Sequence, residues 1–348
     1  MKILLGMSGG LDSTYAAHKL LSLGHEVEGA VLLMHEYTDA SAARESADSL
    51  GISLHVVDCR ERFSRIVVEN FLDEYLQGRT PNPCVICNSE VKFTALLDYA
   101  LEHGFDAIAT GHYAKINAKK SKNGTLYSLL RAKDAKKDQT YMLWRLPQRV
   151  LERLVLPLAE EEKSAIRSSA SELGLFAADR EESQEICFIP SGDYASFIED
   201  RRGKSKKGVF INNEGKILGE HNGIIRYTVG QRKGLGIAMG ERVFVTKINP
   251  IDNTITLSAD DSYANEIELS GIVFSGIEEP PSGEELRLSV KVRYLAPPVE
   301  CRLSYLGGGK ALARLASPVR AVTAGQSAVF YDGEELCAGG FIDKSSLI

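Results

Sequence analysis

The sequence of 348 residues lacks any apolar run long enough to cross a membrane. Its N-terminus also lacks the features of a signal peptide, because Lys2 is followed by a few apolar residues and then at once by a glycine-rich loop. Cysteine is scarce, and its six positions are too few for a disulfide scaffold. We therefore expect a cytoplasmic protein in which any special cysteine is reactive or binds a metal.

Basic charge is not in excess either. The chain carries 41 Lys and Arg residues against 47 Asp and Glu residues, and its net charge of −6 argues against a surface that binds nucleic acid everywhere. The basic residues are unevenly spread, however, and cluster at 115–137 and 201–207. A single lysine-rich cluster is most often a solvated loop. Two such clusters beside nucleotide chemistry favour a phosphate backbone as partner.

The hydrophobic pattern divides the chain into two parts. Over the first half, apolar strand-like runs alternate with helix-like segments, which predicts an α/β doubly wound parallel sheet with ligands at the carboxyl ends of its strands. After about Pro190 the period shortens to two, which predicts a small all-β barrel in the last third. We expect a catalytic domain over 1–200, a central domain over 201–266 and a C-terminal β-barrel over 267–348.

The most informative motif is Ser8-Gly9-Gly10-Leu11-Asp12-Ser13, which follows an apolar strand and opens a helix. Such a turn directs backbone N–H groups and the positive end of a helix dipole at one spot, which suits an anion. It lacks the lysine of the GxxxxGK[ST] loop. The motif resembles the pyrophosphate loop (PP loop) of enzymes that split ATP into AMP and pyrophosphate. We therefore expect an oxygen to be adenylated and then displaced by a nucleophile.

Three cysteines are candidates for that nucleophile. Cys84 and Cys87 follow Asn82-Pro83 in a stiff loop, before a helix that we predict to begin near Ser89. A cysteine at a helix N-terminus has a lowered pKa, so we expect a thiolate here near neutral pH. A zinc knuckle would need a second cysteine pair, which the sequence lacks. Cys187 has apolar neighbours, as buried core cysteines do, but beside the other pair it becomes a candidate nucleophile or resolving thiol.

Together these motifs resemble those of the tRNA-specific 2-thiouridylases. The likeness covers the whole chain in the family's order. It includes the loop at 6–13, the segment Thr-Pro-Asn-Pro-Cys-Val-Ile-Cys-Asn at 80–88, the run Glu-Ser-Gln-Glu-Ile-Cys-Phe-Ile-Pro at 182–190 and Gly-Gln-Arg-Lys-Gly-Leu-Gly at 230–236. The loop alone is shared by many ATP pyrophosphatases, whereas the other three segments are highly specific as a set.

The resemblance implies particular roles. ATP, with Mg²⁺, would be bound by Gly6, Met7, Ser8, Gly9, Gly10, Leu11, Asp12, Ser13, Leu32 and Gly111. The target uridine at the tRNA wobble position would lie against Asn82, Pro83 and Cys84. Contacts with tRNA would come from His112, Lys137, Asp138, Gln139, Arg293, Tyr294 and Gln326. In the family's scheme uracil O2 is adenylated, the outer sulfur of a Cys187 persulfide displaces AMP, and Cys87 closes a disulfide with Cys187 to release 2-thiouridine.

The sequence departs from the family pattern at Cys84, where aspartate is commoner. Thiolates of Cys84, Cys87 and Cys187 could instead hold a 4Fe–4S cluster with one iron open to sulfide. The persulfide and cluster schemes both stay open on the sequence alone. Two smaller departures are a short segment between Met34 and Ala42 and the apolar Leu295 after the tRNA-contacting pair.

Two other classes compete with sulfur transfer. A PP-loop ligase that uses ammonia or an amine would need the loop but no cysteine pair. A tRNA-binding protein with a degenerate loop would not need Ser8, Asp12 and Ser13, which are all present. We expect a monomer that receives sulfur from a desulfurase, a relay protein or free sulfide.

Overall fold

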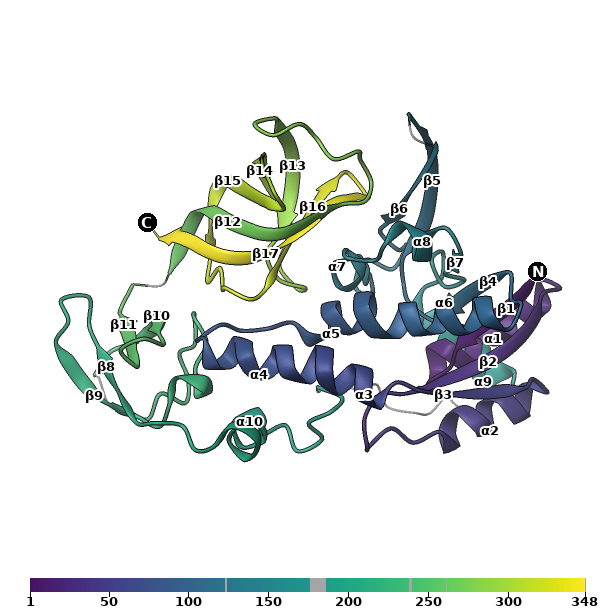
Figure 1. The fold of residues 1–348 in the computed structure, drawn as a ribbon, viewed down its shortest axis with the longest axis horizontal. Coiled ribbons are helices and arrows are strands. Elements are labelled where there is room, and N and C mark those ends of the chain that lie inside the picture. Colours follow the sequence, from purple (N-terminus) through teal and green to yellow (C-terminus); the bar gives the residue numbers. More distant parts are fainter. Residues whose placement is uncertain (123, 176–185, 238–239, 261, 348) are drawn as a thin grey trace.

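The computed structural model describes Met1 to Leu347 except for residues 123, 176–185, 238–239 and 261. The described chain builds three sheets. In Figure 1 a parallel sheet lies at the right, a small sheet at the lower left and a barrel above them. Two long helical runs cross the centre of the view and connect these parts.

The parallel sheet has the order β3-β2-β1-β4-β7. Its strands are β1 (Lys2–Gly6), β2 (Glu26–Leu33), β3 (Leu54–Asp58), β4 (Ala107–Thr110) and β7 (Leu154–Val155), and every neighbouring pair is parallel. The strand order reverses at β1 and β4, so the loops after these two strands open at a topological switch point, where open α/β sheets bind ligands. The predicted doubly wound fold is confirmed.

Strand β1 shows why helices cover both faces of this sheet. Side chains alternate along a strand, and Ile3 and Leu5 are buried with α1 (Leu11–Ser22), α2 (Ser41–Leu50) and α9 (Lys163–Glu172). Leu4 points to the other face, where it is buried with α6 (Phe93–Glu102). A strand that is apolar on both faces must be covered twice.

Two helical runs each contain a π-helical turn. The first contains α3 (Arg60–Phe63), a π-helical turn over Ser64–Val68, and α4 (Glu69–Leu76). The second contains α5 (Pro83–Ile86), a π-helical turn over Cys87–Lys92, and α6. The prediction that this second run begins near Ser89 is wrong, because Pro83 occupies the first turn, where its fixed φ and missing N–H are tolerated.

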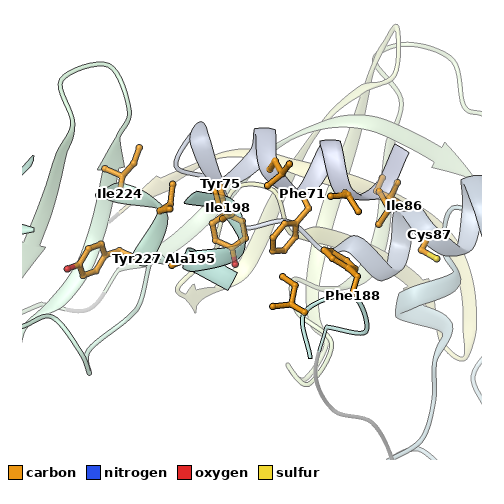
Figure 2. Packing of buried hydrophobic residues seen from close by; sticks show 14 of the residues in the cluster. Phe71, Tyr75, Ile86, Cys87, Phe188, Ala195, Ile198, Ile224 and Tyr227 are labelled. Carbon is orange, nitrogen blue, oxygen red and sulfur yellow. The ribbon is translucent and has the colours of Figure 1, made fainter. Parts of the chain in front are cut away.

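The central part is a four-stranded sheet of order β10-β11-β8-β9, built from β8 (Gly208–Ile211), β9 (Ile217–His221), β10 (Phe244–Asn249) and β11 (Thr254–Ser258). Strands β10 and β11 form an antiparallel hairpin. This sheet packs on α4 and on α10 (Tyr194–Arg202) through one shared apolar core (Figure 2). The ring of Tyr75 on α4 stacks on that of Tyr194, with centroids 4.8 Å apart.

The last part is a closed barrel, as predicted. Its strands are β12 (Tyr263–Phe274), β13 (Glu285–Lys291), β14 (Val299–Gly307), β15 (Lys310–Arg320), β16 (Ser327–Asp332) and β17 (Glu335–Leu347), and pairing of β12 with β17 closes the ring. A hairpin from the first half, β5 (Lys115–Ser121) and β6 (Gly124–Leu130), joins the same sheet by pairing with the start of β17. Main-chain hydrogen bonds between β6 and β17 therefore join the barrel to the nucleotide-binding part.

Trp144 reinforces this junction. It follows α7 (Thr140–Leu143), is almost completely buried, and donates its indole N–H to Ser327 Oγ at 3.0 Å. Its ring lies so close to β17 that a Cβ added to Gly339 would be 2.4 Å from it. The remaining short helix of this region is α8 (Gln148–Leu151). Among the described residues, none of the helices has both the length and the apolar character needed to span a bilayer.

The contact between Gly339 and Trp144 yields a stability prediction. Gly339→Ala should lower the free energy of unfolding by about 1–3 kcal/mol, because either the indole or β17 must shift. Gly340→Ala is the matched control, since its added Cβ would meet its nearest neighbour at 3.4 Å. Thermal and denaturant unfolding of both variants checks this, and equal losses for the two would contradict the packing described.

Candidate nucleotide and thiol site

The PP loop is held rigidly between β1 and α1. Gly9 has φ +75°, and a Cβ there would lie 2.3–2.6 Å from Ala42, so only glycine fits. Ser13 Oγ donates to the Gly10 carbonyl at 3.0 Å and accepts from the Ser8 N–H at 3.3 Å. These hydrogen bonds fix the shape of the turn. The N–H groups at the start of the twelve-residue helix α1 lie at the same place.

The turn after β4 lies directly on this loop. A Cβ on Gly111 would be 2.7 Å from the Asp12 carbonyl carbon and 2.9 Å from Ser13 N, so a larger residue would push the two segments apart. Tyr113, just beyond, donates its hydroxyl to Asp12 Oδ1 at 2.6 Å. Leu32, the remaining residue predicted for ATP, is partly buried on β2 beside β1. The structure thus brings the predicted nucleotide residues to one edge of the sheet.

Lys163 completes this group, and sequence reasoning missed it. Its Nζ donates to Asp12 Oδ1 at 2.7 Å from the first turn of α9. It lies 151 residues after Asp12, so no local motif signals the contact.

Cys84 and Cys87 lie in the first turns of the second helical run. Cys84 is exposed, whereas Cys87 is buried at the start of the π-helical turn. Only a short segment separates this run from α4, and the barrel holds that segment in place. Gln326 donates to the carbonyl oxygens of Thr80 at 2.9 Å and Pro81 at 3.2 Å. The barrel thereby fixes where the two thiols stand.

The same segment is anchored from the other side by Arg79. Its guanidinium pairs with Glu74 at 2.8 Å and with Asp343 of β17 at 3.4 Å. A pocket of about 170 Å³ opens here between α4, the segment and the barrel, with Asn82, Ile86 and Phe341 in its wall.

Cys187 lies a hundred residues after Cys87 in the chain, yet it is near enough to contribute to the raised pKa of the Cys87 thiol. The next two residues, Phe188 and Ile189, are almost fully buried. Figure 2 shows the Phe188 ring packed beneath α4 beside Phe71, with centroids 5.3 Å apart, and it also packs against Phe63 at 5.5 Å. Phe188 is therefore the anchor that presents Cys187. The predicted motif residues 182–185 lie outside the described chain.

The environment of the thiols disagrees with one prediction. The pKa of Cys87 is raised to about 12, mainly by burial and to a smaller extent by the neighbouring thiols of Cys187, Cys84 and Cys59. The pKa of Cys187 is also raised, first by loss of solvent and then by Cys84. The expected low-pKa thiolate at Cys87 is wrong, because the helix begins a full turn earlier and Cys87 is buried inside it. All three cysteines are free thiols in this structure.

The residues predicted to contact tRNA fall into two groups. Three of them form hydrogen bonds that hold nearby segments of the chain in place. Asp138 is buried, and its carboxylate accepts from Thr140 Oγ1 at 2.8 Å and from two backbone N–H groups. Gln139 accepts the Tyr113 N–H at 2.9 Å, and Gln326 holds Thr80 and Pro81 as described above. Their side chains therefore support the site from within, and direct contact with tRNA stays a prediction.

His112, Lys137, Arg293 and Tyr294 form the second group. Burial lowers the pKa of His112 to about 3, so its imidazole is neutral, and Nδ1 lies 2.9 Å from Thr110 Oγ1. Arg293 is exposed and donates to the Arg320 carbonyl at 3.1 Å, while Lys137 and Tyr294 are partly buried. For these residues too, contact with tRNA stays a prediction.

The basic cluster at 115–137 is partly neutralised within the chain. Lys115 pairs with Glu160 at 2.7 Å and Lys119 with Glu335 at 2.9 Å. In the second cluster Arg202 pairs with Glu69 and with Asp73. The prediction that these clusters grip phosphates therefore rests on their other lysines and arginines.

Thiol reactivity tests this arrangement. A thiol is alkylated as its thiolate, so at pH 8 we expect iodoacetamide to modify Cys84 first, Cys187 next and Cys87 last. The Cys87 rate should rise roughly tenfold per pH unit below its pKa of about 12. Peptide mass spectrometry at several pH values measures this, with urea-unfolded protein as the control. Labelling of folded Cys87 as fast as that of Cys84 would show that Cys87 is not buried.

Comparisons with known proteins agree with this geometry. Family models described as a tRNA methyl transferase HUP domain, a tRNA methyl transferase PRC-barrel domain and an aminomethyltransferase beta-barrel domain match residues 1–191, 195–259 and 265–342. The fold and the loop thus define a nucleotide-binding protein of the HUP or PP-loop class, followed by two β domains.

Relatives narrow the class. The chain is 42% identical over 361 residues to the tRNA-specific 2-thiouridylase MnmA of Acetivibrio thermocellus, covering 98% of this chain and 99% of that protein. It is 42% identical over 360 residues to the protein of the same name from Carboxydothermus hydrogenoformans, covering 99% and 98%. The chain belongs to the tRNA-specific 2-thiouridylase family, which confirms the resemblance found in its motifs.

Solved structures give weaker matches. A predicted subunit of tRNA methyltransferase from Methanocaldococcus jannaschii is 19% identical with a TM-score of 0.31, covering 49% of this chain and 76% of that one. We draw nothing from a likeness at this level.

Proposed function

We propose that this protein uses ATP to replace O2 of the wobble uridine of tRNA with sulfur. The main support for the proposal is that the same fold holds a PP loop and three cysteine thiols. The helical run from Pro83 to Glu102 carries Cys84 and Cys87 in its first turns, and its later turn places Leu96 against Gly6 of the loop. From Cys87 to Leu96 the axis spans about 14 Å, and we propose that one nucleotide binds between the loop and the thiols.

The first chemical step is adenylation. Uracil O2 attacks the α-phosphorus of ATP, the bond to the β-phosphate oxygen breaks, and pyrophosphate leaves. N–H groups of the loop and of the start of α1 would hold the phosphates. Mg²⁺ prefers a carboxylate together with substrate phosphates. The partly exposed Asp12 carboxylate fits that preference, and bound Mg²⁺ would neutralise phosphate charge.

The second step is sulfur transfer. The outer sulfur of a Cys187 persulfide attacks C2 of the activated uracil, and AMP leaves with the electron pair of the C2–O bond. The Cys87 sulfur then attacks Cys187 Sγ, the sulfur–sulfur bond to the substrate breaks, and its electrons stay on the new 2-thio group. A Cys87–Cys187 disulfide remains. A raised pKa keeps Cys87 protonated and inert until this step.

Cysteine variants separate this scheme from its competitors. Cys187→Ser should abolish 2-thiouridine formation and AMP release, while pyrophosphate release with tRNA and ATP continues, because adenylation needs no thiol. Cys87→Ser should block turnover after the persulfide has reacted. Cys301→Ser, at a buried thiol inside the barrel, is the control and should keep wild-type activity. Pyrophosphate measurement follows adenylation, and AMP measurement with mass analysis of the wobble nucleoside follows sulfur transfer.

Each competing function predicts a different outcome of that assay. AMP release by Cys187→Ser at the wild-type rate would favour a ligase that uses an amine. Absence of AMP formation by the wild-type chain would favour a protein that only binds tRNA.

An iron–sulfur cluster is the less favoured route. Among the residues that the structure describes, no three His, Cys, Asp or Glu side chains are grouped so that they could hold a metal ion. Cys87 is also buried within a helix, whereas an open iron must be reached by sulfide. We therefore propose the persulfide route, with Cys84 as a neighbour of the target base. Asn82, in the wall of the 170 Å³ pocket, and the adjacent Pro83 would lie against the same base.

Iron measurement tests this choice. After anaerobic reconstitution with iron and sulfide, followed by desalting, the wild-type chain and Cys84→Ser should both hold negligible iron. Both should thiolate tRNA when a persulfide donor is supplied. Stoichiometric iron in the wild type that is lost in Cys84→Ser, together with iron-dependent activity, would replace the persulfide route with the cluster.

The domain boundaries, oligomeric state, cellular location, sulfur donor and tRNA contacts are also proposed. We propose domain boundaries near residues 200 and 266, a monomer, a cytoplasmic location and a sulfur donor that is a desulfurase, a relay protein or free sulfide. We also propose that Lys137, Arg293, Tyr294 and other lysines and arginines of the basic clusters contact tRNA. Affinity that falls steeply between low and physiological salt would support that last point.

A further inference from the structure

Lys163 is a buried cation at the edge of the nucleotide site. It is only 8% exposed, and lysine is almost never buried without a charged partner. That partner is Asp12 of the PP loop, 2.7 Å away, where the Tyr113 hydroxyl also donates to the same oxygen at 2.6 Å. The Lys163 ammonium lies 5.9 Å from the centre of the Tyr113 ring.

The fold fixes the start of α9 from several sides. Asp134 accepts the Lys163 backbone N–H at 3.1 Å. Ile166 and Ala170, one and two turns further along, are fully buried against α1. Just before α9, Glu161 pairs with Lys19 on α1. The position of Lys163 is therefore set by packing that does not depend on its own ammonium group.

The pair between Lys19 and Glu161 already joins the α9 segment to α1, at a more exposed place. A second pair that ends on the PP loop itself is unnecessary for docking the helix. The Lys163 ammonium instead lies beside Asp12, the one carboxylate of the loop, where we expect phosphate oxygens to bind. In the GxxxxGK[ST] loop a lysine follows the glycines directly and reaches the terminal phosphates. This chain has no lysine in that position.

We infer that Lys163 is the phosphate-binding lysine of this site, supplied from α9 instead of from the loop. This inference rests on the ATP half of the proposed function. Without nucleotide, Lys163 neutralises Asp12. With ATP bound, its ammonium donates to the oxygens of the pyrophosphate group and stabilises the negative charge that builds up as pyrophosphate leaves. Tyr113 keeps Asp12 oriented while Lys163 turns to the phosphates.

The test compares ligands that share or lack the pyrophosphate group. Isothermal titration is done with ATP, inorganic pyrophosphate and adenosine, each with Mg²⁺, on the wild type, Lys163→Met and Lys163→Gln. Loss of a charge-assisted contact should weaken ATP and pyrophosphate binding by about 10- to 100-fold. Adenosine affinity should be unchanged. Lys163→Gln keeps a hydrogen-bond donor beside Asp12, so it serves if Lys163→Met does not fold.

Lys19→Met is the matched control, since it removes the other lysine pair between α1 and the α9 segment. It should leave all three affinities at wild-type values. Wild-type affinity for pyrophosphate in either Lys163 variant would overturn the inference, as would an equal loss of adenosine and ATP binding. If the wild-type chain bound neither ATP nor pyrophosphate, the proposed function itself would fail instead.

Discussion

The site depends on one continuous helical run that connects the thiols with the nucleotide-binding loop. Pro83 starts this run and Glu102 ends it. Its first turns carry the thiols, and Leu96 in its later part packs against the strand residue that opens the PP loop. A helix is stiff over this length, so the distance between nucleotide and sulfur is set by residue count and not by loop flexibility. The π-helical turn at Cys87–Lys92 lies between the two, a kind of irregularity that is frequent at functional sites.

Both ends of that run are held by parts of the chain that are remote in sequence. At the thiol end, the barrel binds the preceding segment through Gln326, and the aromatic ring of Phe188 fixes Cys187. At the nucleotide end, the Gly111 turn lies directly on the loop, and Lys163 and Tyr113 share an oxygen of Asp12. The parts of the chain therefore hold the site together. The β5–β6 hairpin contributes by pairing with β17.

Features encoded locally could be predicted from the sequence. The PP loop needs only a strand, two glycines and a helix start, all adjacent in the chain. The barrel follows from strict alternation, as in β13. Features that depend on tertiary contacts could not be predicted. The contact of Lys163 with Asp12 spans 151 residues. The high pKa of Cys87 results from burial under segments from three parts of the chain, and the lysines of β5 meet acidic partners only after folding.

The most direct test of the account is a single turnover by chain that already carries a persulfide on Cys187. It is mixed with tRNA and Mg-ATP under anaerobic conditions, without a further sulfur source or reductant. We predict 2-thiouridine and AMP in equal amounts, and a new disulfide between Cys87 and Cys187 that appears at the same rate in peptide mass spectra. Formation of 2-thiouridine with both cysteines still reduced would contradict the account, because sulfur would then have come from elsewhere than Cys187.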